Sequence, residues 1–97
     1  LKLLIRAVGP TLASLGVTGV LADPTITLYR GSTVLATNDN WSAADAATMT
    51  AVGAFALTAG SRDAAIVTTL PAGSYSAIVS GVGGTTGTAL VELYVVP

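Results

Sequence analysis

The sequence predicts an all-β protein: an antiparallel, jelly-roll-like β-sandwich of about six to eight strands with one or two short helical turns. Two observations predict this class. Apolar and polar residues alternate over short segments, as they do in strands that are buried on one face only. Turn residues such as Gly, Pro and Asp recur about every eight to twelve positions, which is the spacing of strands in a sandwich. The 97 residues form one domain over 1–97 with a single core.

The first expected strand covers residues 1–8, because apolar residues alternate there and the cations Lys2 and Arg6 share the outer face. Residues 9–10, a Gly-Pro pair, end this strand. Proline suits the first position of a helix, so we expect one helical turn over residues 10–15.

A hairpin is expected next. Residues 25–30 alternate cleanly, residues 31–32 form a Gly-Ser turn, and residues 33–37 form the returning strand. The preceding segment, residues 18–23, fits a strand or a loop equally well, and residues 23–24, an Asp-Pro pair, indicate a turn.

The middle of the chain predicts a short helix. Ser42 and Asp45 have the spacing of a capping box, and alanine-rich sequence follows as far as about Val52, where Gly53 ends the helix. Residues 63–70 then alternate as another strand.

The last segment, residues 70–97, predicts two alternating strands that a glycine-threonine turn over residues 81–87 joins into a closing hairpin. Its wet faces carry hydroxyl groups together with Glu92 and Tyr94. The residues expected on the dry faces are Tyr75, Ala77, Val79, Ala89, Val91, Leu93 and Val95. Because the turn lacks a following helix, its glycines do not form a phosphate-binding loop.

The composition excludes several classes of function. Only 9% of the residues are charged, and the net charge of -1 gives no electrostatic footprint for nucleic acid or anionic lipid. No apolar run approaches the roughly 20 residues of a membrane span. Without His or Cys, the chain cannot form a Ser-His-Asp or Cys-His site, nor a thiolate zinc site. We therefore expect a protein that is not an enzyme.

The most polar cluster, Asn38, Asp39 and Asn40, has two interpretations. Oxygen ligands in such a turn suit a weak calcium site. The alternative is a purely structural turn without metal, in which Asn and Asp close the backbone before the Ser42 cap. The adjacent Trp41 is either a packing anchor or a platform for a glycan.

The two ends of the chain predict strands without the usual protection of edge strands by Pro or Lys clusters. Residues 1–8 and 90–96 either pair within this domain or complete the sheet of a neighbour. The candidate assembly residues are Leu1, Leu3, Ile5, Val91, Leu93 and Val95. Since both ends look like interior sequence, we expect a processed product or one unit of a longer chain.

Four motifs carry a resemblance to a known kind of module. They are Leu-Leu-Ile-Arg-Ala-Val-Gly-Pro at 3–10, Asn-Asp-Asn-Trp at 38–41, Leu-Pro-Ala-Gly-Ser-Tyr at 70–75 and Ala-Leu-Val-Glu-Leu-Tyr at 89–94. With these motifs the whole chain resembles a β-sandwich module of large exported proteins of environmental bacteria. Its second half is also similar, more weakly, to bacterial pre-peptidase C-terminal domains, which are jelly rolls. The resemblance implies an extracellular or cell-surface module without enzyme activity. Some members of the second group bind calcium at the corresponding turn, which implies a calcium site at Asp39 together with Asn38 and Asn40.

Together these observations predict a non-catalytic structural module, a subunit or repeat of an extracellular fibre, stalk or surface assembly joined through terminal strands. Its partners would be copies of itself or neighbouring repeats of the same polypeptide. The alternative is a calcium- or carbohydrate-binding accessory module of a secreted hydrolase or adhesin, with a polysaccharide as partner. We expect no cofactor in the first case and calcium in the second.

Overall fold

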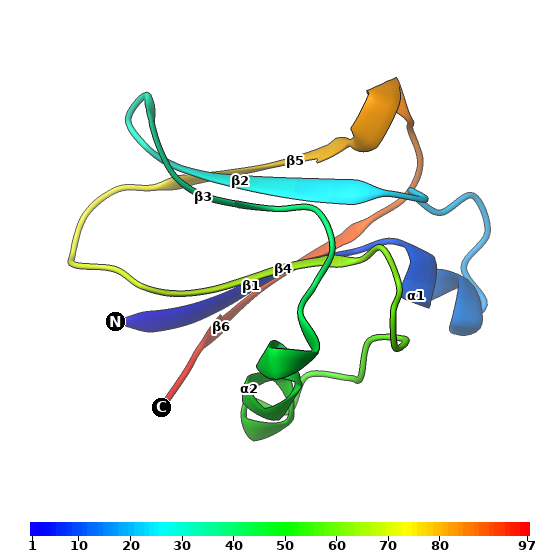
Figure 1. Cartoon of the computed structure of the whole chain (residues 1–97), viewed down its shortest axis with the longest axis horizontal. Helices are drawn as coiled ribbons and strands as arrows, with labels where there is room; N and C mark the ends of the chain where they lie inside the picture. Colours follow the sequence, from blue (N-terminus) through cyan, green and yellow to red (C-terminus); the bar gives the residue numbers. More distant parts are fainter.

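The computed structural model describes residues 1–97 as two three-stranded antiparallel sheets, which confirms the predicted all-β sandwich (Figure 1). The elements in chain order are β1 (Lys2–Val8), α1 (Pro10–Ser14), β2 (Pro24–Arg30), β3 (Thr33–Asn38), the 3-10 turn η1 (Ala43–Asp45), α2 (Ala46–Ala51), β4 (Ala64–Thr69), β5 (Ser76–Gly81), the 3-10 turn η2 (Val82–Gly84) and β6 (Leu90–Val95). Both helices are too short to span a lipid bilayer.

One sheet has the strand order β4-β1-β6 and the other has the order β3-β2-β5. The expected hairpin of β2 and β3 is confirmed, with a bulge between Leu28 and Tyr29. The expected closing hairpin is wrong, because β5 pairs with β2 and β6 pairs with β1. The glycine-rich connection crosses from one sheet to the other instead of turning tightly. Thr88 anchors it by hydrogen bonds with Gly19 and Leu21 in the loop after α1.

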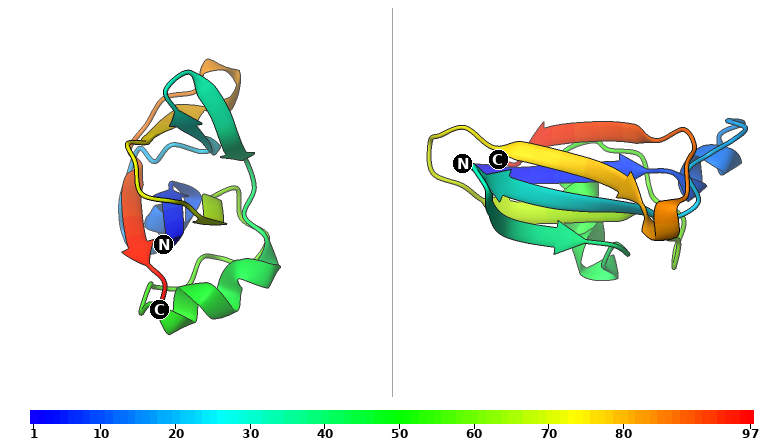
Figure 2. Two further views of the ribbon diagram at one scale, coloured as in Figure 1. Left: turned by 90° about the vertical axis from the view of Figure 1, so that its left-hand side faces the viewer. Right: turned by 90° about the horizontal axis from the view of Figure 1, so that it is seen from above.

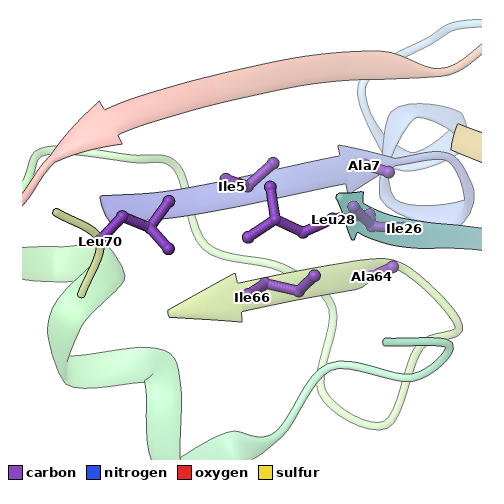
Figure 3. Close-up of a cluster of buried hydrophobic side chains, with 7 residues drawn as sticks. All are labelled: Ile5, Ala7, Ile26, Leu28, Ala64, Ile66 and Leu70. Carbon is purple, nitrogen blue, oxygen red and sulfur yellow. The ribbon is translucent and has the colours of Figure 1, made fainter. Parts of the chain in front are cut away.

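The first core fills the space between the two sheets. Figure 3 shows its seven buried side chains, which come from β1, β2, β4 and the residue after β4: Ile5, Ala7, Ile26, Leu28, Ala64, Ile66 and Leu70. In antiparallel sheets, directly paired residues share a face, so alternate residues of β1 and β2 point into this layer. Full burial of one such aliphatic side chain stabilises the fold by about 1.5–3 kcal/mol.

A second core covers the opposite face of the β4-β1-β6 sheet. Helix α2 and the segment after it form a third layer there (Figure 2, left). The buried members of this cluster are Leu4, Val8, Leu12, Met49, Leu57 and Ala65. Ser42 caps the helical segment as expected, but its Oγ accepts from the backbone N–H of Ala44 at 3.2 Å and the first turn is a 3-10 turn.

Arg6 is fully buried, so the expectation that it lies on an outer strand face is wrong. Its Nε donates to Oε1 of Glu92 at 2.9 Å, and its Nη1 donates to the Phe55 carbonyl at 2.7 Å. Nη2 lies 2.9 Å from the same carboxylate oxygen without hydrogen-bond geometry, so it contributes to the ion pair alone. The guanidinium also lies 4.5 Å from the centre of the Phe55 ring. These contacts tie β6 and the third layer to β1.

Asp63 is also fully buried. Its Oδ1 accepts from the backbone N–H groups of Gly9 at 2.8 Å and Thr11 at 3.2 Å. Its Oδ2 accepts from the hydroxyls of Thr11 and Ser61. The Asp63 carboxylate therefore accepts the backbone N–H groups at the start of α1 that would otherwise need water as a partner.

Gly9 itself is required at this turn. A Cβ on Gly9 would lie 2.0 Å from the Leu21 carbonyl oxygen, so only glycine fits.

Candidate functional site

The two sheets are offset, and β6 projects beyond the edge of the sheet that faces it. Seen from above, β6 lies outside β5 (Figure 2, right). Its side chains that point toward the opposite sheet are consequently uncovered: Val91 is 54% exposed, Leu93 64% and Val95 59%. The sequence correctly assigns these residues to the inner face, since they pair with Ala7, Ile5 and Leu3, but that face is open. Exposed apolar rows of this kind mark interaction surfaces.

A hollow of about 290 Å³ lies between the sheets beside this row. It is lined by apolar residues alone, from both sheets and the β4–β5 connection: Leu3, Ile5, Leu28, Leu70, Tyr75, Ala77 and Leu93. A second hollow, of about 410 Å³, continues it toward Leu1 and Pro71. The open side of the sandwich is thus a shallow apolar groove flanked by β5 and β6.

The backbone of β6 has a free edge on this side. The N–H of Val96 donates to the Lys2 carbonyl at 2.9 Å, which makes Lys2 and Val96 a hydrogen-bonded pair of the ladder. Hydrogen-bonded and non-hydrogen-bonded pairs alternate in antiparallel ladders. With the observed register, the N–H and C=O groups of Val91, Leu93 and Val95 therefore point away from β1. The same three residues supply the free backbone groups and the exposed side chains.

The other strand edges differ. The edge of β4 is covered, because Ala65 donates its N–H to Oδ1 of Asn38 at 3.0 Å and Trp41 donates its N–H to the Asp63 carbonyl at 2.9 Å. The edge strand β3 is bulged in its pairing with β2, a device that discourages further pairing. The edge of β5 is free, but serine, alanine and glycine provide most of its residues. Only β6 combines a free edge with a row of large apolar side chains.

The opposite face of β6 is packed, contrary to the expected wet face. Glu92 and Tyr94 are half-buried, and Tyr94 packs against the second core. The Tyr94 hydroxyl donates to Oε2 of Glu92. This hydrogen bond is the largest cause of a raised pKa of Tyr94, followed by burial and the negative charge of Glu92, while Arg6 acts in the opposite direction. The Glu92 carboxylate thus bonds to Arg6 and Tyr94 on the face of β6 that the third layer covers, and it puts no charge on the open face.

The candidate assembly residues divide into two groups. Those on β1 lie in the middle strand of their sheet, with both edges paired, and Ile5 is buried in the first core. Leu1 precedes β1 and exchanges hydrogen bonds with Leu70. Val91, Leu93 and Val95 instead line the free edge. The two terminal strands pair with each other, and of these two only β6 has an edge that is open to another chain.

The Asn38–Asn40 turn is held by hydrogen bonds of its own. Nδ2 of Asn38 donates to the Asn40 carbonyl at 3.1 Å, while Oδ1 of Asn38 receives the N–H from β4. Asp39 lies beside Asp23, and side-chain hydrogen bonding with Asp23 is the largest cause of a raised pKa of Asp39. Oδ1 of Asp23 is buried without a hydrogen-bond partner, and Oδ2 lies 3.9 Å from Arg62. No cluster of three or more acidic, His or Cys side chains forms there.

Trp41 is half-buried and packs against the second core. Its Nε1 donates to the Ser61 hydroxyl at 3.1 Å, which links it to the Asp63 network. The indole also borders a hollow of about 220 Å³ beside α2, lined mainly by apolar residues that include Met49 and Leu57. As expected for a packing anchor, Trp41 joins β4 to the helical layer.

Comparison with protein-family models, with curated proteins and with solved structures finds no match to this chain. The sequence interpretation missed two features that shape the site, the burial of Arg6 and the overhang of β6. A lone Arg amid the apolar residues of a strand is the one available signal for the first. The overhang has no signal in the sequence because it depends on how the two sheets are offset.

Proposed function

We propose that this chain is a non-catalytic structural module that joins neighbouring modules through β6, as a part of an extracellular fibre, stalk or surface layer. The observation that carries the proposal is the free edge of β6, where Val91, Leu93 and Val95 expose both apolar side chains and outward backbone groups. Natural proteins usually protect such an edge with charge, proline or a bulge. Within Leu90–Val95, β6 has no proline and no bulge. Its one charged residue, Glu92, forms an ion pair with Arg6.

The energetics favour a neighbour at this edge. Each of the three side chains is more than half exposed, and covering it would contribute about 1 kcal/mol. The net charge of -1 and the small number of charges oppose association only weakly. Hydrogen bonds between the free N–H and C=O groups of β6 and another strand would also fix the orientation of the partner.

Light scattering across a wide concentration range, followed by negative-stain microscopy, tests the proposal. We expect the parent chain to associate as its concentration rises and Leu93→Lys to remain monomeric, because a cation on the edge resists pairing. Leu15→Lys is the matched control, since Leu15 is 60% exposed and follows α1 without being part of any strand edge. A parent chain that stays monomeric throughout, or equal behaviour of the two variants, would contradict the proposal.

A second candidate function is cation binding, which the placement of Asp23 beside Asp39 favours. Calcium takes oxygen ligands from carboxylates and carbonyls, and the buried Oδ1 of Asp23 lacks a partner. A calcium titration followed by calorimetry and thermal melting tests it. Binding heat and a higher melting temperature in the parent, both absent from Asp39→Asn, would support it. No heat and no shift in the parent would exclude it.

A further inference from the structure

We infer that the partner of β6 is β6 of a second copy of this chain, paired antiparallel about a twofold axis at Leu93. The inference rests on the proposed function and adds the identity, direction and register of the partner strand. The pairing would join two β4-β1-β6 sheets into one continuous sheet.

The hydrogen-bonding pattern selects this register. The outward N–H and C=O groups belong to Val91, Leu93 and Val95, so the hydrogen-bonded pairs across the new edge must be formed among these residues. An axis at Leu93 pairs Leu93 with Leu93 of the second copy, and it pairs Val91 with Val95 in both directions. All the free backbone groups of the strand then have partners.

Charge selects the same register. With the axis at Leu93, Glu92 lies opposite Tyr94 of the second copy, and the two Glu92 residues are kept apart. Moving the axis to Glu92 would put two carboxylates directly opposite each other in a non-hydrogen-bonded pair, where side chains approach most closely. Moving it to Tyr94 would put Val91 opposite Pro97 of the second copy, which lies outside β6 and has no N–H to donate. β6 is therefore complementary to itself in one register.

Burial of apolar surface also favours a second copy. A perpendicular twofold axis keeps the exposed rows of both copies on the same face of the joined sheet. The row of Val91, Leu93 and Val95 in one copy then stands against the matching row of the other, in the gap beside each β5. A pair of short strands buries less than the roughly 1,200 Å² of a standard interface, so we expect a dissociation constant in the order of micromolar or weaker.

Cysteine cross-linking tests the register, because the chain has no Cys of its own. A hydrogen-bonded antiparallel pair has Cα atoms about 5.5 Å apart, within the range of a disulfide. Leu93→Cys should therefore form a disulfide dimer on oxidation, about tenfold more than the exposed control Leu15→Cys. Val91→Cys alone and Val95→Cys alone should form no more than the control, since equivalent positions lie about 13 Å apart along the strand. A mixture of the Val91→Cys and Val95→Cys variants should form a disulfide dimer that contains one chain of each.

The outcomes separate this inference from the proposed function. Leu93→Cys dimers together with Val91→Cys/Val95→Cys mixed dimers support it. The inference would be overturned if Leu93→Cys formed no more disulfide dimer than Leu15→Cys, or if Val91→Cys alone formed abundant dimer. If the parent chain still associates and Leu93→Lys blocks association, the proposed function survives and only the partner strand is wrong. A parent chain that is monomeric up to about 1 mM would remove both.

Discussion

Arg6 and Glu92 are joined across β1 and β6 by a hydrogen bond of 2.9 Å, although they lie 86 positions apart in the sequence. The Arg6 side chain is fully buried and Glu92 is 15% exposed. Removing one partner of a buried ion pair leaves the other charge uncompensated. We expect Glu92→Gln to lower the free energy of unfolding by about 3 kcal/mol, measured by urea denaturation.

The matched control is Arg62→Gln, which breaks the exposed 3.9 Å contact with Asp23 and should change the free energy of unfolding by less than about 1 kcal/mol. The double variant Arg6→Met/Glu92→Leu should recover part of the loss, because an apolar pair avoids the cost of buried charge. Equal effects of Glu92→Gln and Arg62→Gln would mean that the Arg6–Glu92 pair does not hold β6 in place.

Asp63 provides a second test of the buried polar network. Oδ1 of Asp63 accepts from two backbone N–H groups and Oδ2 accepts from the hydroxyls of Thr11 and Ser61. Asn has nearly the same shape but keeps only one acceptor oxygen, so its NH2 group would face one of these two sets of donors. The Thr11 hydroxyl oxygen already accepts from the Thr58 N–H at 3.0 Å, and its proton is donated to Asp63. We expect Asp63→Asn to cost about 3 kcal/mol of unfolding free energy. If Asp63→Asn and the parent had the same urea concentration at the midpoint of unfolding, Asp63 would not have this stabilising role.

Asp39 should make stability depend on pH. Its pKa is raised above the ordinary value of 3.8, first by the hydrogen bond with Asp23, then by burial and by the charge of Asp23, while Arg62 lowers it. A group whose pKa is raised by folding contributes stability that is complete below 3.8 and is lost as the pH rises through the folded-state pKa.

Asp39→Asn should therefore melt like the parent at about pH 3 and higher than the parent at about pH 7, by up to a few degrees. Thermal melting across this range measures the difference. Asp45→Asn is the control, since it removes an equal charge from a residue that does not contribute to the raised pKa of Asp39. A parent that melts higher than Asp39→Asn at neutral pH would reverse the sign and refute the interaction.

Much of the fold follows from local sequence patterns. Alternation and turn residues located β1, β2, β3 and β4 to within a few positions, because pleating and the freedom of glycine act locally. The Ser42 cap likewise located the helical segment before Gly53. The pairing of β5 and β6 was not predictable in this way. Alternation defines which residues share a face, but the neighbour of each strand depends on long-range contacts.

The site was predictable only in part. Val91, Leu93 and Val95 were assigned to the correct face, yet their exposure results from the offset between two sheets, which no local pattern encodes. The burial of Arg6 and Asp63 depends on partners more than 50 positions away in the sequence. A charge that is rare in an apolar strand is a signal of such a partner, because unpaired charges are seldom buried.

Amide hydrogen exchange along β6 tests the central claim most directly, because alternate N–H groups of this strand point in opposite directions. In dilute protein, the amides of Glu92 and Tyr94 should be protected by β1, while those of Val91, Leu93 and Val95 should exchange rapidly. In concentrated protein, we expect the exchange of these three amides to slow by about tenfold or more as a second strand accepts them. Rapid exchange of all three in associated material would contradict an interface at the edge of β6.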